Sequence, residues 1–265
     1  MKTLVSCVIA LVGFAAAAGA QVAVPPADSL YVSGEAASSR AVSGGGGGVD
    51  WVHRVSARSI ITAGAASMRI GDELWTYGTL GGFVRRRDIW LSGSVGFGAG
   101  RRGPDSFPYV RVAGAALIPI ARAFSAEIEG QFVSLNGTPI RVAKVGALYG
   151  GFRKTSVRAA YVGASAPSQY WQFLFTRGDV SLGRVGVLAG LTAGRGSTHL
   201  AALAPDLLLH TSREIFFGGS VRAGGFQTTC IAQVVQQADS RLARLMVTVQ
   251  VPLGSRSAVT SGTAK

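Results

Sequence analysis

Short stretches that alternate apolar with small or polar residues recur along most of this sequence, and they constrain its fold more than any other feature. In IWLSGSVGFGAG, residues 89–100, the side chains of Leu91, Val95 and Phe97 share one parity, and serine or glycine fills most positions of the other. The same period occurs in YWQFLFTR, where it puts Trp171 and Phe173 on the apolar face, and in LARLMVTVQV near residue 250. A period of two is typical of a strand whose two faces meet different surroundings. The pattern predicts an all-β fold.

A soluble β-sandwich shows the same period as a membrane barrel. The two folds are distinguished by what surrounds each face of their strands. No apolar run after residue 20 reaches the roughly 18 residues that a membrane-spanning helix needs. Glycine and serine crowd the polar faces, and charged residues make up 15% of the chain, against about 25% in ordinary globular domains. Aromatic residues fall near predicted strand ends, where an interfacial girdle belongs; they are Trp75, Tyr109, Tyr149, Tyr170 and Trp171. We predict a closed antiparallel transmembrane β-barrel, with a soluble periplasmic β-domain as the alternative.

The number of strands follows from counting the alternating segments. Thirteen such segments fit between residues 47 and 253. Because bacterial single-chain barrels have an even number of strands, the prediction is about 12 strands, with 10 to 14 possible.

The ends of the chain differ in composition from its middle. Residues 1–20 combine Lys2, an apolar stretch and the motif Ala18-Gly19-Ala20, which is the pattern of a cleaved signal peptide. Prolines and the glycine run at residues 44–48 predict a flexible segment over residues 21–46, followed by the barrel over 47–253 and a disordered polar tail over 254–265. Export through a signal peptide, combined with the predicted barrel, predicts localisation in the cell outer membrane.

A local turn sets the register of one predicted hairpin. Asn136-Gly137 lies between two alternating runs, and this dipeptide favours a type I′ turn. Pairing about that turn puts Glu129 opposite Lys144 and brings the polar faces of both strands together.

Charged residues on the polar faces are the candidate site residues. A charge on the lipid face costs roughly 2–4 kcal/mol at mid-membrane for arginine or lysine, so these side chains are expected to line the lumen. They are Arg111, Glu127, Glu129, Lys144, Arg158 and Arg244. Luminal arginines would bias an open pore toward anions.

The excess of basic over acidic residues indicates which partners the chain could contact. The formal net charge is +13, and it is carried almost entirely by arginine. Arg85–Arg87 and Arg101–Arg102 lie at predicted turns, so we expect contact with outer-membrane lipids and lipopolysaccharide, or else simple solvation of these charges. We expect no nucleic-acid partner, because the sequence does not combine a basic groove with interleaved stacking aromatics.

One arrangement merits comparison with an enzyme. His210 and Ser212 share a strand face with Glu214, and the pair is similar to the His-x-Ser element of outer-membrane lipid A deacylases, in which histidine acts as general base for serine. Arg213 stands where that family has asparagine, and a polar loop is the alternative. The three histidines are too scattered for a metal site, and no nucleotide motif is complete. We predict that the chain is not an enzyme and holds neither metal nor cofactor.

The region from about Tyr109 to Gly194 resembles the YaiO-like outer-membrane β-barrels. The resemblance lies in the strand pair that contains LIPIARAFSAEIEGQFVSL, in VAKVGALYGGFRKTSVRAAYVGAS and in the aromatic strand YWQFLFTRG. It implies a barrel in the outer membrane of a Gram-negative bacterium, inserted by the barrel-assembly machinery and without established chemistry. The final strand departs from the usual aromatic ending, because it runs into Val251-Pro252-Leu253.

These observations predict an outer-membrane barrel with a structural or surface role or a narrow solute passage. An anion-preferring porin-like channel is the first alternative, and a lipid A-modifying hydrolase is the second.

Overall fold

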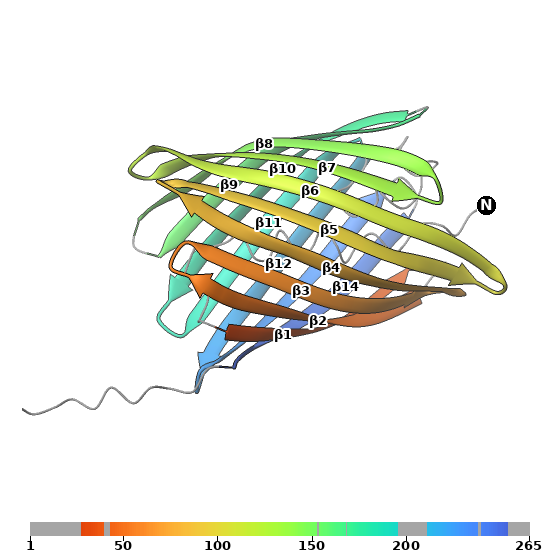
Figure 1. Ribbon diagram of the computed structural model, residues 1–265, viewed down its shortest axis with the longest axis horizontal. Helices are drawn as coiled ribbons and strands as arrows, with labels where there is room; N and C mark the ends of the chain where they lie inside the picture. Colours follow the sequence, from red (N-terminus) through yellow and green to blue (C-terminus); the bar gives the residue numbers. More distant parts are fainter. Residues whose placement is uncertain are drawn as a thin grey trace, which may run out of the picture.

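The described part of the chain is a single β-sheet closed into a barrel (Figure 1). The computed structural model describes residues 28–39, 43–152, 154–167, 169–195, 211–237 and 240–253. Within these ranges 14 antiparallel strands follow one another around the barrel, and β1 pairs with β14. They are β1 Asp28–Ser39, β2 Ser43–Ser56, β3 Ser59–Ile70, β4 Glu73–Arg86, β5 Ile89–Arg102, β6 Asp105–Ala121, β7 Phe124–Leu135, β8 Thr138–Phe152, β9 Thr155–Ala166, β10 Gln169–Leu182, β11 Val185–Arg195, β12 Thr211–Ala223, β13 Phe226–Gln237 and β14 Ser240–Pro252. None of the described residues form a helix that is long and apolar enough to cross a membrane.

The number of strands corrects the prediction of about 12. The segment predicted to be flexible, residues 21–46, contains all of β1 and the start of β2. β1 pairs with β2 on one side and β14 on the other, so it closes the barrel and removes the exposed sheet edges. The predicted signal peptide, residues 1–20, and the predicted tail, residues 254–265, lie outside the described residues.

The barrel has two ends, which we name after one turn residue each. At the Asn136 end, β3 joins β4, β5 joins β6 and β7 joins β8, and the longest connection, residues 196–210, joins β11 to β12. At the Arg122 end, β2 joins β3, β4 joins β5, β6 joins β7, β8 joins β9, β10 joins β11 and β12 joins β13. The first residue of β1 and the last residue of β14 lie at this end too. Three register irregularities, in β2, β6 and β8, all lie near the Arg122 end.

The β7–β8 hairpin has the turn and the register that the sequence predicts. Asn136 and Gly137 have positive φ angles of 49° and 79°, as a type I′ turn requires. Glu129 pairs with Lys144 across the hairpin. The predicted register is therefore confirmed.

The two faces of the closed sheet differ sharply in chemistry. Large apolar side chains of alternate positions are exposed around the outside, among them Phe97, Val145 and Phe217, which are 56–60% exposed. The charged residues of the intervening positions are buried on the inner face, as for Arg111 and Arg244. An apolar belt outside and charges inside is the arrangement of a barrel in lipid. A sandwich would instead pack its apolar faces against a second sheet, so the alternative of a soluble sandwich is wrong.

Candidate functional site

Four charged side chains on adjacent strands form a network on the luminal face. Lys144 Nζ of β8 lies 2.9 Å from Glu127 Oε1 and 2.7 Å from Glu129 Oε2, both of β7. Arg158 Nε of β9 lies 3.2 Å from Glu127 Oε2. Residues two apart on a strand share a face, which is why both glutamates point into the lumen. Two carboxylates therefore face two cations, and the network is close to neutral.

Two further luminal arginines also pair with acids. Arg177 Nη2 lies 2.7 Å from Asp179 Oδ1 on the same strand, β10. Arg244 of β14 donates from Nε to Glu35 Oε2 of β1 at 3.0 Å, across the strand pair that closes the barrel. Arg244 is among the luminal residues predicted from the sequence, whereas Glu35, Arg177 and Asp179 are not. Asp179 could have been predicted from its spacing of two residues from Arg177 on one strand. Glu35 lies within residues 21–46, the segment predicted to be flexible.

Arg111 is the exception among these arginines. It is 6% exposed, and its Nη2 donates to Gln131 Oε1 at 3.3 Å. Its Nε has no hydrogen-bond partner, and no carboxylate within the described ranges pairs with it. A solute in the lumen would thus meet a guanidinium at Arg111 that lacks an acidic partner, whereas Arg158, Arg177 and Arg244 each have one.

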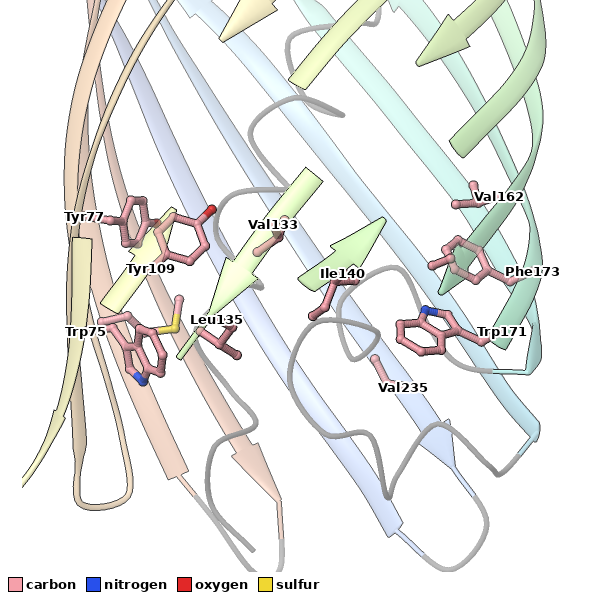
Figure 2. Close-up of a cluster of buried hydrophobic side chains, with 12 residues drawn as sticks. Trp75, Tyr77, Tyr109, Val133, Leu135, Ile140, Val162, Trp171, Phe173 and Val235 are labelled. Carbon is pink, nitrogen blue, oxygen red and sulfur yellow. The ribbon is translucent and has the colours of Figure 1, made fainter. Parts of the chain in front are cut away.

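Bulky apolar side chains gather on the luminal face toward the Asn136 end (Figure 2). Trp171 is 1% exposed, Tyr109 is 2% exposed and Val133 is fully buried. We call this group the apolar cluster; it comprises Met68, Trp75, Tyr77, Tyr109, Val133, Leu135, Ile140, Val162, Ala164, Trp171, Phe173 and Val235. Apolar side chains that fill the interior of a barrel reduce the cross-section left for solutes.

The apolar cluster corrects the predicted facing of several aromatic residues. Trp171 and Phe173 were expected on the lipid side, but both are buried inside, and Leu174 is the exposed neighbour. Trp75 and Tyr109, expected in the interfacial girdle, also point inward, whereas Tyr170 is 64% exposed on the outside. Alternation identifies two faces but does not say which is the inner one when both carry apolar residues.

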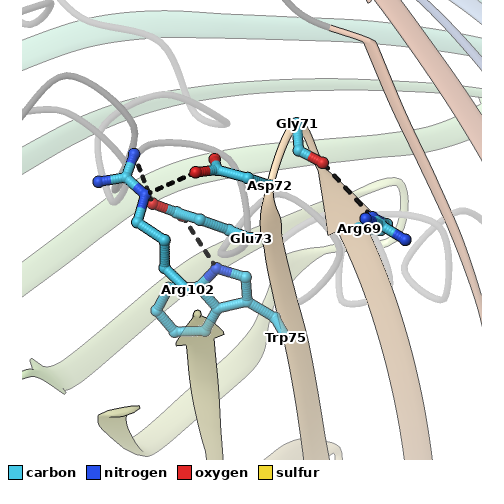
Figure 3. Close-up of polar contacts among 6 residues, drawn as sticks. All are labelled: Arg69, Gly71, Asp72, Glu73, Trp75 and Arg102. Carbon is cyan, nitrogen blue, oxygen red and sulfur yellow. Dashed lines mark hydrogen bonds and ion pairs between the residues drawn. The ribbon is translucent and has the colours of Figure 1, made fainter. Parts of the chain in front are cut away.

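A second polar group lies beside the apolar cluster at the Asn136 end (Figure 3). Trp75 Nε1 donates to Glu73 Oε2 at 3.3 Å. Arg102 Nε lies 3.1 Å from Asp72 Oδ2, and its Nη2 lies 3.5 Å from Glu73 Oε1. Arg69 donates to the carbonyl oxygen of Gly71 at 3.4 Å. Arg102, which was expected to contact lipid phosphates, is therefore engaged with two carboxylates of its own chain.

The Arg122 end holds a cavity of about 600 Å³ at the mouth of the lumen. Trp90, Leu117 and Leu148 form its apolar wall, and Arg85 and Arg122 lie at its rim. Trp90 pairs with Leu117 across β5 and β6, and Leu148 pairs with Arg158 across β8 and β9. These registers put the mouth cavity on the luminal face, next to the ion-pair network.

The structure describes only part of the His-x-Ser element and the residues around it. His210 lies outside the described residues, and Glu214 of β12 is buried and hydrogen-bonded to Gln233 Nε2. His53, another histidine of the chain, pairs with Asp28 and stacks on Trp51 with ring centroids 5.3 Å apart. Within the described ranges, no group of three or more histidine, cysteine, aspartate or glutamate residues could hold a metal ion.

Comparison with solved structures identifies the fold. The chain is similar to the monoaromatic hydrocarbon channel CymD, with a TM-score of 0.59 and 7% identity over 85% of this chain and 87% of the other. The Pseudomonas putida toluene transporter TodX gives a TM-score of 0.57 and 7% identity over 85% and 89% of the two chains. The Acinetobacter baumannii outer-membrane protein Omp33 gives 0.53 and 12% identity over 84% and 97%.

No protein-family model matches the sequence. No curated protein matches it significantly either. The similarity to solved structures therefore rests on the fold. Together with the apolar belt, this fold is that of a β-barrel integral to the outer membrane, as in the solved structures named above.

Proposed function

We propose that this protein is a membrane-anchored barrel with a structural or surface role, and that its lumen is obstructed. The observation that carries the proposal is the content of the lumen. The apolar cluster occupies the inner face toward the Asn136 end, and the network around Lys144 occupies the adjoining wall with its charges paired. A barrel whose interior is filled by side chains can hold the protein in the membrane without forming an open pore for solutes.

Conductance in planar bilayers tests the proposal. The purified wild-type barrel is expected to give no stable conductance steps. Trp171→Ala, which removes one of the two tryptophan side chains of the apolar cluster, is expected to introduce or enlarge steps. Leu174→Ala, three residues along the same strand but exposed on the outside, is the control and should match the wild type.

Large and regular steps from the wild type would overturn the obstructed lumen. Their selectivity would then identify the kind of passage. Trp171→Ala and Leu174→Ala behaving alike would show that the apolar cluster does not control the lumen.

A narrow solute passage is the second candidate function. The mouth cavity and the inward-facing aromatic residues support it, because they provide apolar surface along the route of a solute. CymD is described as a monoaromatic hydrocarbon channel and TodX as a toluene transporter, and a small apolar solute suits the inner lining here. Anion preference, as in a porin-like channel, rests on Arg111, since Arg158, Arg177 and Arg244 face carboxylates.

The proposal also covers the orientation of the barrel in the membrane, its assembly, its partners and its family. Short turns of bacterial barrels face the periplasm and longer loops face outward, so we place the Asn136 end, with its connection over residues 196–210, at the cell surface. The barrel-assembly machinery would insert the chain, and outer-membrane lipids with lipopolysaccharide would surround it. Membership of the YaiO-like barrels rests on the strand pattern of residues 109–194.

The named structural neighbours are channels and transporters, which supports a non-enzymatic role. Release of acyl chains from purified lipopolysaccharide tests the alternative of a lipid A-modifying hydrolase. The wild type is expected to be as inactive as His210→Ala. Activity that this substitution abolishes would establish the hydrolase instead.

A further inference from the structure

The mouth cavity has the size and the wall of a binding site for a small molecule. Its volume of about 600 Å³ falls within the range of roughly 300–1,000 Å³ that is common for such sites. Trp90, Leu117 and Leu148 supply apolar surface from β5, β6 and β8. Because they belong to different strands of one sheet, the wall is held by backbone pairing and is formed before any ligand arrives.

The polar groups of the mouth cavity are mostly cationic. Arg85 Nη2 lies 3.3 Å from Asp88 Oδ1, and the guanidinium lies 5.8 Å from the centre of the Trp90 ring. Arg122 also borders the cavity, and no acid within the described ranges pairs with it. The cavity therefore has two guanidinium groups and one carboxylate, which pairs with Arg85, and Arg122 is the group available to an anion.

The surrounding rim strengthens this positive charge. Each of the six turns at the Arg122 end carries an exposed cation at or beside the turn, while Asp88 is the one acid among the turn residues themselves. Among the residues that the structure describes, these exposed cations are Arg58, Arg85, Arg86, Arg87, Arg122, Lys154, Arg184 and Arg222. At the other end, acids stand beside the arginines, as Asp72 and Glu73 do beside Arg102. A ring of like charges around an opening raises the local concentration of the opposite ion.

We infer that the mouth cavity binds a small organic anion with a flat apolar body, such as an aromatic carboxylate. The body lies against Trp90, Leu117 and Leu148, and the carboxylate meets the Arg122 guanidinium. Arginine suits this role because its planar fork of N–H donors matches the two oxygens of a carboxylate. The inference goes beyond the proposed function, since a ligand can occupy the mouth whether or not the lumen conducts.

Calorimetric titration of naphthalene-2-carboxylate into the barrel tests this inference. The barrel is held in nanodiscs of zwitterionic phosphatidylcholine, and empty nanodiscs give the background. Saturable binding to the wild type is expected. Arg122→Gln should weaken it about tenfold, the size of effect expected for one charge-assisted hydrogen bond.

The controls separate the mouth cavity from general attraction by the basic chain. Arg101→Gln removes an exposed arginine at the opposite end and should leave the affinity unchanged. The uncharged naphthalene-2-carboxamide should bind the wild type about tenfold more weakly than the carboxylate. It should also be insensitive to Arg122→Gln.

Two results would overturn the inference: no saturable binding of the carboxylate to a folded wild-type barrel, or equal losses for Arg122→Gln and Arg101→Gln. Folding of each variant is checked by the shift in gel migration between unheated and heated samples. Because the titration needs no conducting lumen, its failure is distinguishable from failure of the proposed function.

Discussion

At the scale of single residues, pairing explains how an apolar barrel accommodates so many charges. Glu127 and Glu129 lie side by side on the inner face and share Lys144. The side chain of Lys144 is 18% exposed, so most of its hydration is lost on folding. Removing one partner of a buried pair leaves an uncompensated charge, which costs more than the pair contributed.

Lys144→Met is therefore expected to lower the free energy of unfolding by about 2–4 kcal/mol, because two carboxylates then face Arg158 alone. Urea titration of the barrel in phospholipid vesicles measures this loss. Lys154→Met, at an exposed turn of the Arg122 end, is the control and should change the free energy by less than about 0.5 kcal/mol. Equal effects of the two substitutions would show that the network contributes nothing specific.

The sequence predicts part of this residue-scale arrangement. The opposition of Glu129 and Lys144 follows from one turn and a period of two, both of which are local. The pairing of Glu35 with Arg244 depends on barrel closure between residues far apart in the chain, and no local pattern contains that information. The inward direction of Trp171 was missed for a related reason, since the contents of the lumen decide which face accommodates an indole.

At the scale of strands and turns, glycine serves two different purposes. Gly137 has a φ of +79°, a conformation that costs an ordinary residue roughly 1–2 kcal/mol. Gly46 on β2 is extended, but a Cβ built there would lie 2.6 Å from the carbonyl oxygen of Ser67. The glycine run that suggested a flexible segment thus belongs to a strand that lies very close to its neighbour β3.

Gly137→Ala should lower the free energy of unfolding by about 1–2 kcal/mol, because alanine is strained at positive φ. Gly130→Ala in the same hairpin is the control, since nothing lies within 4 Å of the position of its added Cβ. The same urea titration compares the two variants. A smaller loss for Gly137→Ala than for Gly130→Ala would contradict the turn assignment.

At the scale of the whole molecule, the barrel separates apolar from charged chemistry in two directions. Across the wall, apolar side chains lie outside and paired charges lie inside. Along the barrel, the apolar cluster lies toward the Asn136 end, and the basic rim with its mouth cavity lies at the Arg122 end. The proposed obstruction of the lumen and the inferred anion site at the mouth both rest on this arrangement.

The fold, the lumen and the mouth cavity all depend on alternate side chains pointing outward to lipid, and β13 is the strand on which this can be measured. Cys230 is free and exposed there, and Thr229 and Ile231 are its neighbours on the opposite face. The probes are the native cysteine and, in a Cys230→Ser background, single cysteines at positions 229, 231 and 232. Each is labelled with an environment-sensitive fluorophore in bilayers whose lipid chains carry bromine, which quenches on contact. Strong quenching is expected at positions 230 and 232, and weak quenching at 229 and 231. Equal quenching at all four positions, or the reverse alternation, would show that these side chains do not alternate between lipid and lumen.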